Sequence, residues 1–141
     1  GASNLLGGTI ASHDETTTVV SVAGGTLRVP NTRVPDLHGS RQVKVGVRPE
    51  KITIVAGTNP VPTDRNAVQG LVRVAAFTGV GNQYLVQTID GVEVTVYAQN
   101  VGDIAAPRSG EHVTLTWRID NTFIVTPRLD SDQLQEEDAN E

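Results

Sequence analysis

A chain of 141 residues can form one domain or two very small ones, and its core must come mostly from Val, Ile, Leu and Ala, because only 4% of the residues are aromatic. Cysteine is absent, which excludes disulfide bonds and thiolate metal sites. The net charge of −5 is uneven, because six of the 16 acidic residues lie within 130–141 and the remaining ten face 11 basic residues. We therefore expect a nearly neutral body with a disordered acidic tail at 130–141, or a tail that orders on a partner.

Alternation of apolar and polar residues between turn residues predicts ten short β-strands. In chain order, the first set covers 8–12, 16–23, 26–29, 43–47 and 52–55. The second set covers 70–77, 83–89, 92–98, 113–119 and 122–126. No window before the tail has helical periodicity, so the sequence predicts an all-β fold, either a barrel or a sandwich.

Three two-residue connections are expected to be tight hairpin turns: Gly24-Gly25, Asp90-Gly91 and Asp120-Asn121. Gly, Asn and Asp tolerate the positive φ that such turns require. Asp90-Gly91 is the strongest of the three predictions.

The two sets of strands resemble each other in order and pattern. Gly8-Thr9-Ile10 corresponds to Gly70-Leu71-Val72, and Val43-Lys44-Val45 corresponds to Val113-Thr114-Leu115, with an offset that grows from 62 to 70. We interpret this as a duplicated β-unit, with repeats at roughly 1–56 and 66–129. The alternative is that two β-meanders share glycine turns and valines by chance.

Sequence motifs of catalysis are absent. The chain has no Walker A sequence, and Gly79-Val80-Gly81 is followed by a strand, so we predict a loop there and not a phosphate-binding nest. His13, His38 and His112 have no ligand spacing to one another or to a carboxylate. We expect no catalytic, cofactor-binding or metal-binding residue in this chain.

Six basic residues fall within 24 positions: Arg28, Arg33, Arg41, Lys44, Arg48 and Lys51. Single-stranded nucleic acid requires aromatic stacking platforms as well as positive charge. All five aromatic residues lie in the second set of strands, apart from the basic cluster in sequence. We therefore favour a solvated face or a contact with an acidic protein surface, and expect no nucleic acid.

The stretch 43–54 ends one predicted strand and begins the next at Arg48-Pro49-Glu50. Pro49 lacks the N–H that a strand needs, and it holds Arg48 in an extended conformation. Arg48 and Glu50 either pin this turn, by an ion pair or by backbone hydrogen bonds, or contact a neighbouring subunit or domain. If they pin it, Arg48→Ala should cost more than the ~0–1 kcal/mol of an exposed ion pair.

The string Val-Arg-Pro-Glu-Lys-Ile at 47–52 resembles the TOBE (transport-associated OB) domain, as do Ser3-Asn4-Leu5-Leu6-x-Gly8, Asn66-x3-Gly70 and Gly110-Glu111-x-Val113-x-Leu115-x-Trp117. Such domains close the ATP-binding subunits of bacterial ABC importers, and this chain is most similar to the spermidine/putrescine type. The resemblance implies an OB-like β-barrel over 1–129, and it marks Arg48, Pro49 and Glu50 as the signature turn.

The resemblance also implies a role and partners. The chain would be a regulatory and dimerisation domain without catalysis, cut from a longer ATP-hydrolysing subunit whose missing ATPase domain binds ATP and Mg²⁺. Its partners would be that ATPase domain, a second copy of the subunit and the transmembrane permease subunits, on the cytoplasmic face of the plasma membrane. Two alternatives remain: a sensor domain for the solute or an oxyanion, and a nucleic-acid-binding OB protein.

Overall fold

A computed structural model describes residues 2–99 and 106–126, which form ten β-strands and three single-turn 3₁₀ helices. The strands are β1 (Asn4–His13), β2 (Thr17–Val22), β3 (Gly25–Pro30), β4 (Gln42–Val47), β5 (Thr53–Ala56), β6 (Arg65–Phe77), β7 (Asn82–Thr88), β8 (Glu93–Ala98), β9 (His112–Arg118) and β10 (Phe123–Ile124). The 3₁₀ helices are η1 (Asn31–Arg33), η2 (Pro49–Lys51) and η3 (Ile119–Asn121). The predicted acidic tail at 130–141 lies outside the described residues.

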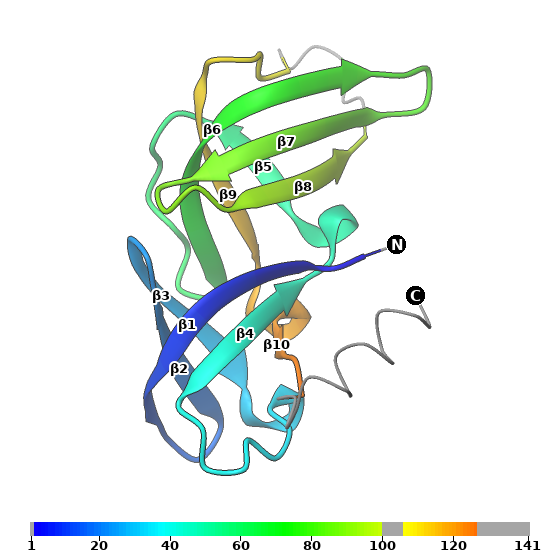
Figure 1. Cartoon of the computed structure of the whole chain (residues 1–141). Coiled ribbons are helices and arrows are strands. Elements are labelled where there is room, and N and C mark those ends of the chain that lie inside the picture. Colours follow the sequence, from blue (N-terminus) through cyan, green and yellow to red (C-terminus); the bar gives the residue numbers. More distant parts are fainter. Residues whose placement is uncertain (1, 100–105, 127–141) are drawn as a thin grey trace.

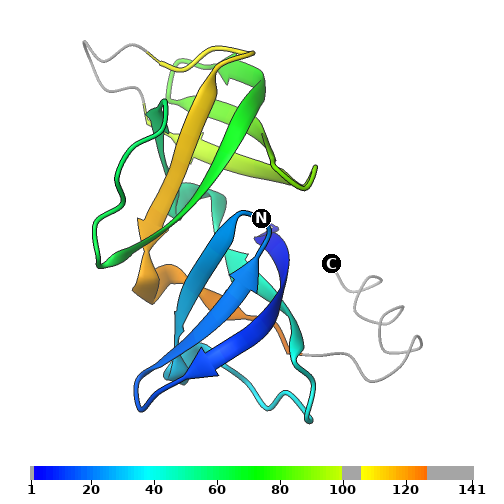
Figure 2. The same ribbon diagram turned by 90° about the vertical axis from the view of Figure 1, so that its left-hand side faces the viewer.

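The strands form two antiparallel five-stranded sheets with the same internal order. The first sheet is β10-β4-β1-β2-β3 and the second is β5-β9-β6-β7-β8. Both are strongly curled and lie one above the other (Figures 1 and 2). The fifth strand of each sheet is exchanged: β5 follows β4 in the chain but pairs with β9, and β10 follows β9 but pairs with β4.

The strand pairings and β-bulges of the two sheets occur at equivalent positions. Asn4 pairs with Val47 at the start of the first sheet, and Asn66 pairs with Trp117 at the equivalent place in the second. A β-bulge interrupts β1 between Ile10 and Ser12, and another interrupts β6 between Val72 and Val74. Equivalent residues in β1 and β6 are therefore 62 positions apart, which is the offset that the sequence predicts for this strand.

A single hydrophobic core joins the sheets. Alternate positions of each strand point inward, and valine dominates these positions because β-branched side chains suit strands. The fully buried side chains of largest volume come from both sheets and include Leu27 and Val45 of the first and Tyr84, Leu115 and Trp117 of the second. These side chains belong to one cluster, so each sheet completes the core of the other.

The predicted all-β fold and OB-like curled sheets are confirmed, and all ten predicted strands occur. The predicted hairpin at Asp120-Asn121 is wrong, because these residues belong to η3, where the chain leaves the second sheet to pair β10 with β4. At the β2–β3 turn the loop is Ala23-Gly24 and not Gly24-Gly25, because Val22 pairs with Gly25. The turn predicted at Asp90-Gly91 occurs, but its loop has three residues, Ile89 to Gly91, because the Thr88 N–H donates to the carbonyl of Val92 at 2.9 Å. Gly24 and Gly91 have φ of 86° and 83°, as tight turns require.

Candidate functional site: a groove and an apolar face on the second sheet

The signature turn lies where the chain crosses between sheets. Arg48 and Glu50 are exposed and Pro49 is buried at the start of η2. The backbone N–H of Lys51 donates to the carbonyl of Arg48 at 3.0 Å. No ion pair joins Arg48 to Glu50 within the described residues, so the backbone and Pro49 hold the turn. The observed hydrogen bonds of this turn use backbone atoms and not the Arg48 side chain. They therefore give no reason for Arg48→Ala to lower the stability of the fold.

Two equivalent asparagines hold the sheets together. Asn4 of β1 donates to the carbonyl of Thr95 and accepts from its N–H, both at 2.8 Å. Asn66 of β6 makes the same pair of bonds to Arg28, again at 2.8 Å. Thr95 lies on β8 and Arg28 on β3, the edge strands of the two sheets. Each asparagine therefore satisfies outward-facing backbone groups on the edge of the other sheet.

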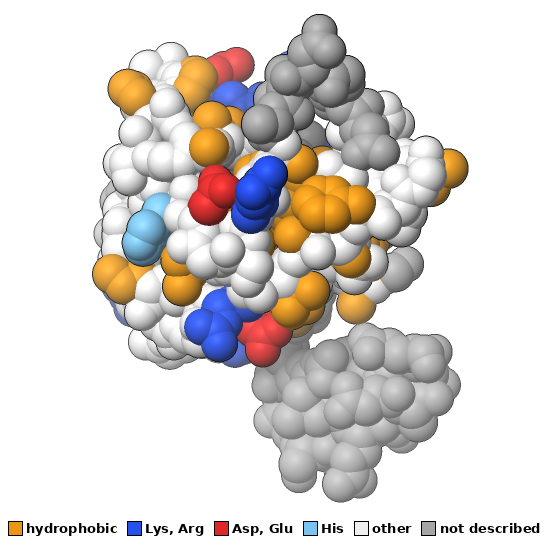
Figure 3. Space-filling model, turned by 90° about the horizontal axis from the view of Figure 1, so that it is seen from above, with side chains coloured by type: hydrophobic (Ala, Val, Ile, Leu, Met, Phe, Trp, Pro, Cys, Tyr) orange, Lys and Arg blue, Asp and Glu red, His pale blue; other side chains and the backbone are white. Residues whose placement is uncertain are grey.

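Large hydrophobic side chains are exposed on the second sheet. They include Phe77 (57% exposed) and Val80 (90%), which lies in the loop between β6 and β7. The apolar face, which we define as Val74 (54%) and Tyr97 (47%), points away from the core, because these residues pair with Leu85 and Gln83 and not with the buried positions of β7. Phe77 lies on the other side of the sheet, where its ring meets that of buried Tyr84 edge-on, with centroids 6.3 Å apart. Figure 3 shows this end of the molecule, where hydrophobic side chains lie in several groups and the largest group borders a basic side chain.

The equivalent positions of the first sheet carry no large hydrophobic side chain that is exposed. Val74 pairs with Leu85 as Ser12 pairs with Val19, and Tyr97 pairs with Gln83 as Pro30 pairs with Thr17. The same strand pairing therefore does not require exposed hydrophobic side chains here. The apolar face is therefore a specific property of the second sheet.

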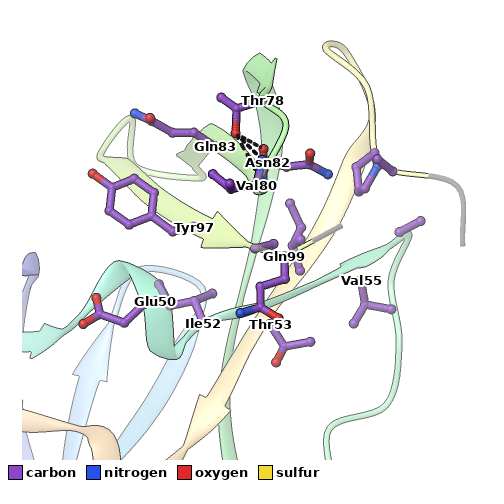
Figure 4. A pocket seen from close by; sticks show the side chains of 16 residues that line it. Glu50, Ile52, Thr53, Val55, Thr78, Val80, Asn82, Gln83, Tyr97 and Gln99 are labelled. Atoms are coloured by element: carbon purple, nitrogen blue, oxygen red, sulfur yellow. Dashed lines mark hydrogen bonds between the residues drawn. The ribbon is translucent and has the colours of Figure 1, made fainter. Parts of the chain in front are cut away.

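A groove of about 1030 Å³ opens beside this face, between β5 and the ends of β7 and β8. Its walls are mainly apolar and include Ile52, Val55, Val80, Ala98 and Pro107. Glu50 and Tyr97 lie on one side of the groove, and Asn82 lies toward the other (Figure 4). Sequence reasoning missed this groove, because the strands that form it lie about 40 residues apart in the chain.

One pair of equivalent positions differs in character between the sheets. In the first sheet the ring of Phe123 packs so closely over Gly46 that a Cβ on this glycine would collide with it. In the second sheet the equivalent pair is Thr53 and Thr116, which face each other across β5 and β9. There the guanidinium of Arg65 donates to the hydroxyls of Thr116 at 3.1 Å and Thr53 at 3.4 Å, so a polar contact takes the place of the aromatic ring.

The other candidates from the sequence have structural roles. Gly79-Val80-Gly81 is a loop between β6 and β7, and the Gly81 N–H donates to the Thr78 hydroxyl at 3.0 Å. Two basic-cluster residues use their guanidinium groups on backbone carbonyls: Arg28 donates to Arg65 and Arg41 to Ile10.

Within the described residues, no group of three or more His, Cys, Asp or Glu side chains is placed to hold a metal ion. In the same part of the chain, no helix has the length and apolar character needed to cross a membrane.

Comparison with known protein families gives a match at residues 45–125, to the TOBE domain. The chain belongs to the TOBE domain family. The match begins within β4, continues through η2 and the whole second sheet, and ends just after β10. This TOBE domain therefore contains the signature turn, the groove and the apolar face within the matched region.

Similar proteins include ATP-binding subunits of importers. The spermidine/putrescine import ATP-binding protein PotA of Thermobifida fusca is 28% identical over 126 residues, covering 89% of this chain and 32% of that protein. PotA of Rubrobacter xylanophilus is 32% identical over 122 residues, covering 83% and 30%. The TOBE domain thus spans about a third of these relatives.

A solved structure shares the fold. The cytoplasmic molybdate-binding protein ModG, with molybdate bound, superposes with a TM-score of 0.70 at 15% sequence identity, covering 88% of this chain and 96% of that one. At this identity the likeness supports the architecture of two curled sheets and nothing about ligands.

Proposed function

We propose that this TOBE domain is the regulatory and dimerisation domain of the ATP-binding subunit of an ABC-type importer for polyamines or a related solute. The PotA relatives support this role, because each is an ATP-binding subunit that this chain matches over about a third of its length. The domain itself carries no catalysis in this proposal. ATP and Mg²⁺ would be bound by an ATPase domain, and the whole subunit would lie on the cytoplasmic side of the membrane beside permease subunits.

The observation that carries the proposal is the apolar face. An exposed hydrophobic surface that is concentrated on one of two equivalent sheets is typical of a protein contact. In our proposal this face contacts a second copy of the subunit. A contact that differs between two states of the dimer would bias closure around ATP, since coupling arises from differential contacts.

The test is self-association of the chain, followed by sedimentation velocity over a range of concentrations. Wild type should dimerise, and Val74→Glu should weaken the dimer about tenfold or more, because a charge in an apolar contact loses its hydration. Ser12→Glu is the matched control at the equivalent place on the first sheet and should leave the dimer unchanged. A monomer at every concentration, or equal effects of both variants, would overturn the contact.

An oxyanion sensor is the less favoured alternative. The solved ModG structure has molybdate bound, but among the described residues that line the groove the only charged one is Glu50, which repels anions. A nucleic-acid role is also disfavoured by the use of Arg28 and Arg41 on backbone carbonyls. If affinity for an oligonucleotide fell steeply with salt, this judgement would be reversed.

A further inference from the structure

We infer that the groove of the second sheet binds a small aliphatic amine through one ammonium group. This inference goes beyond the proposed function and does not depend on it, because it concerns binding by the chain itself. Four observations carry it: an acceptor and a carboxylate that have no partner among the described residues, an aromatic ring on the carboxylate's side of the groove, and apolar walls.

The unpaired acceptor belongs to Asn82. Its side chain is only 8% exposed and lies against the groove, and its Nδ2 donates to the hydroxyl of Tyr84 at 3.1 Å. Its Oδ1 is buried and has no hydrogen-bond partner within residues 2–99 and 106–126. Such an acceptor costs roughly 1–3 kcal/mol, so a buried unpaired oxygen at a groove indicates a missing donor.

The equivalent polar groups of the first sheet are satisfied. Asn82 corresponds to Thr16, whose hydroxyl donates to the Asp14 carboxylate at 3.3 Å. Tyr84 corresponds to Thr18, whose hydroxyl donates to Asn31 Oδ1 at 2.7 Å. The fold can therefore satisfy its polar groups at this place, and only the second sheet leaves one open.

The charge of the groove selects a cation. Glu50 has no ion pair within the described residues, whereas its counterpart Asp120 lies 3.7 Å from the guanidinium of Arg118. Tyr97 lies on the same side of the groove as Glu50 (Figure 4). A carboxylate and an aromatic ring on the same side of a groove suit an ammonium group, which gains from both the charge and the ring face.

The walls of the groove indicate that the rest of the ligand is apolar. Ile52, Val55, Val80 and Ala98 offer apolar surface for a chain of methylene groups. A donor at the far end of the ligand would meet Asn82, on the opposite side from Glu50. Because the described lining holds one carboxylate, a second ammonium group should add little affinity.

The experiment is an NMR titration of the ¹⁵N-labelled chain with butylammonium chloride, with butan-1-ol as the uncharged ligand of equal length. Butylammonium should shift the amide signals of Glu50, Tyr97 and Asn82, and butan-1-ol should bind at least fivefold more weakly. Shifts centred on Asp120 and Phe123 of the first sheet, or no saturable shifts, would overturn the inference. So would stronger shifts with sulfate or molybdate.

Substitutions test whether the carboxylate of Glu50 binds the ammonium group. Glu50→Gln should weaken butylammonium binding about fivefold to tenfold, because the carboxylate becomes a neutral amide of the same shape. Asp120→Asn is the matched control at the equivalent turn, and binding should stay within twofold of wild type. Equal losses in both variants would indicate only general charge attraction and would overturn the site. None of these outcomes bears on dimerisation, so the two proposals can fail separately.

Discussion

At the scale of single residues, the two asparagines that join the sheets differ in burial and in partners. Asn66 is 3% exposed, and besides its two bonds to Arg28 it donates to the hydroxyl of Thr122 at 2.8 Å. That hydroxyl also accepts from the indole of Trp117 at 2.9 Å. Asn4 is 8% exposed and bonds only to the backbone of Thr95.

We therefore expect Asn66→Ala to destabilise the fold more than Asn4→Ala. Removing Asn66 leaves backbone groups of Arg28 without their partner inside the protein, which should cost about 2–4 kcal/mol. Asn4→Ala should cost about 1–2 kcal/mol, because water reaches the exposed strand edge more easily. Urea unfolding of both variants measures the difference. An equal or reversed order would show that the buried network around Thr122 adds nothing.

Two equivalent glycines lie where the neighbouring strand leaves no room for a side chain. A Cβ on Gly8 would lie 2.6 Å from Val20 Cγ1, and one on Gly70 would lie 2.5 Å from Val86 Cγ1. Gly8→Ala and Gly70→Ala should each lower the free energy of unfolding by about 1–3 kcal/mol through overpacking. Gly25 is the control, because its Cβ would meet nothing within 4 Å. If Gly25→Ala cost as much in thermal unfolding, strand propensity and not space would explain all three effects.

At the scale of elements, the connection between β1 and β2 depends on an ionised carboxylate. The backbone N–H groups of Thr16 and Thr17 donate to Asp14 Oδ1 at 2.9 and 2.8 Å. These bonds hold the pKa of Asp14 below its ordinary value of 3.8. A depressed pKa in the folded state contributes stability that is present above 3.8 and is lost as pH falls through the folded value.

The test uses Asp14→Asn, which keeps an acceptor in place and removes the titration. Wild type should melt at a higher temperature than the variant near neutral pH, and the difference should shrink as the pH falls below about 3.8. Glu15→Gln changes the net charge equally at the neighbouring residue and should show no such trend. A melting difference that stays constant across this pH range would contradict the role of the carboxylate.

Local pattern predicts which segments are strands but not which strands pair. The alternation of Val43, Val45 and Val47 identifies β4 because it reports burial on one face. The hairpin expected at Asp120-Asn121 followed the rule that neighbouring strands pair, and here β10 returns to the first sheet. The same limitation explains why the groove was not predicted. Glu50 and Asn82 line one groove only because β5 pairs within the second sheet. Asn4 and Asn66 stood within recognised motifs, yet their bonds to Thr95 and Arg28 depend on tertiary contact.

At the scale of the whole molecule, the exchange of β5 and β10 makes each sheet incomplete without the other. β10 pairs with β4 and β5 pairs with β9, and the buried side chains of both sheets form one cluster. A sheet that lost its exchanged strand would expose an edge and part of its core. Independent unfolding of one sheet would therefore carry the cost of disrupting the other.

We accordingly expect one cooperative transition in urea. The single tryptophan, Trp117, is fully buried in the second sheet, so its fluorescence reports that sheet, while circular dichroism reports all strands. Val20→Ala removes a fully buried side chain of the first sheet, at a cost of about 2 kcal/mol, and should shift both signals equally. If the fluorescence midpoint stayed at its wild-type value while the dichroism midpoint fell, the sheets would unfold as separate units, and the exchanged strands would connect them without coupling their stability.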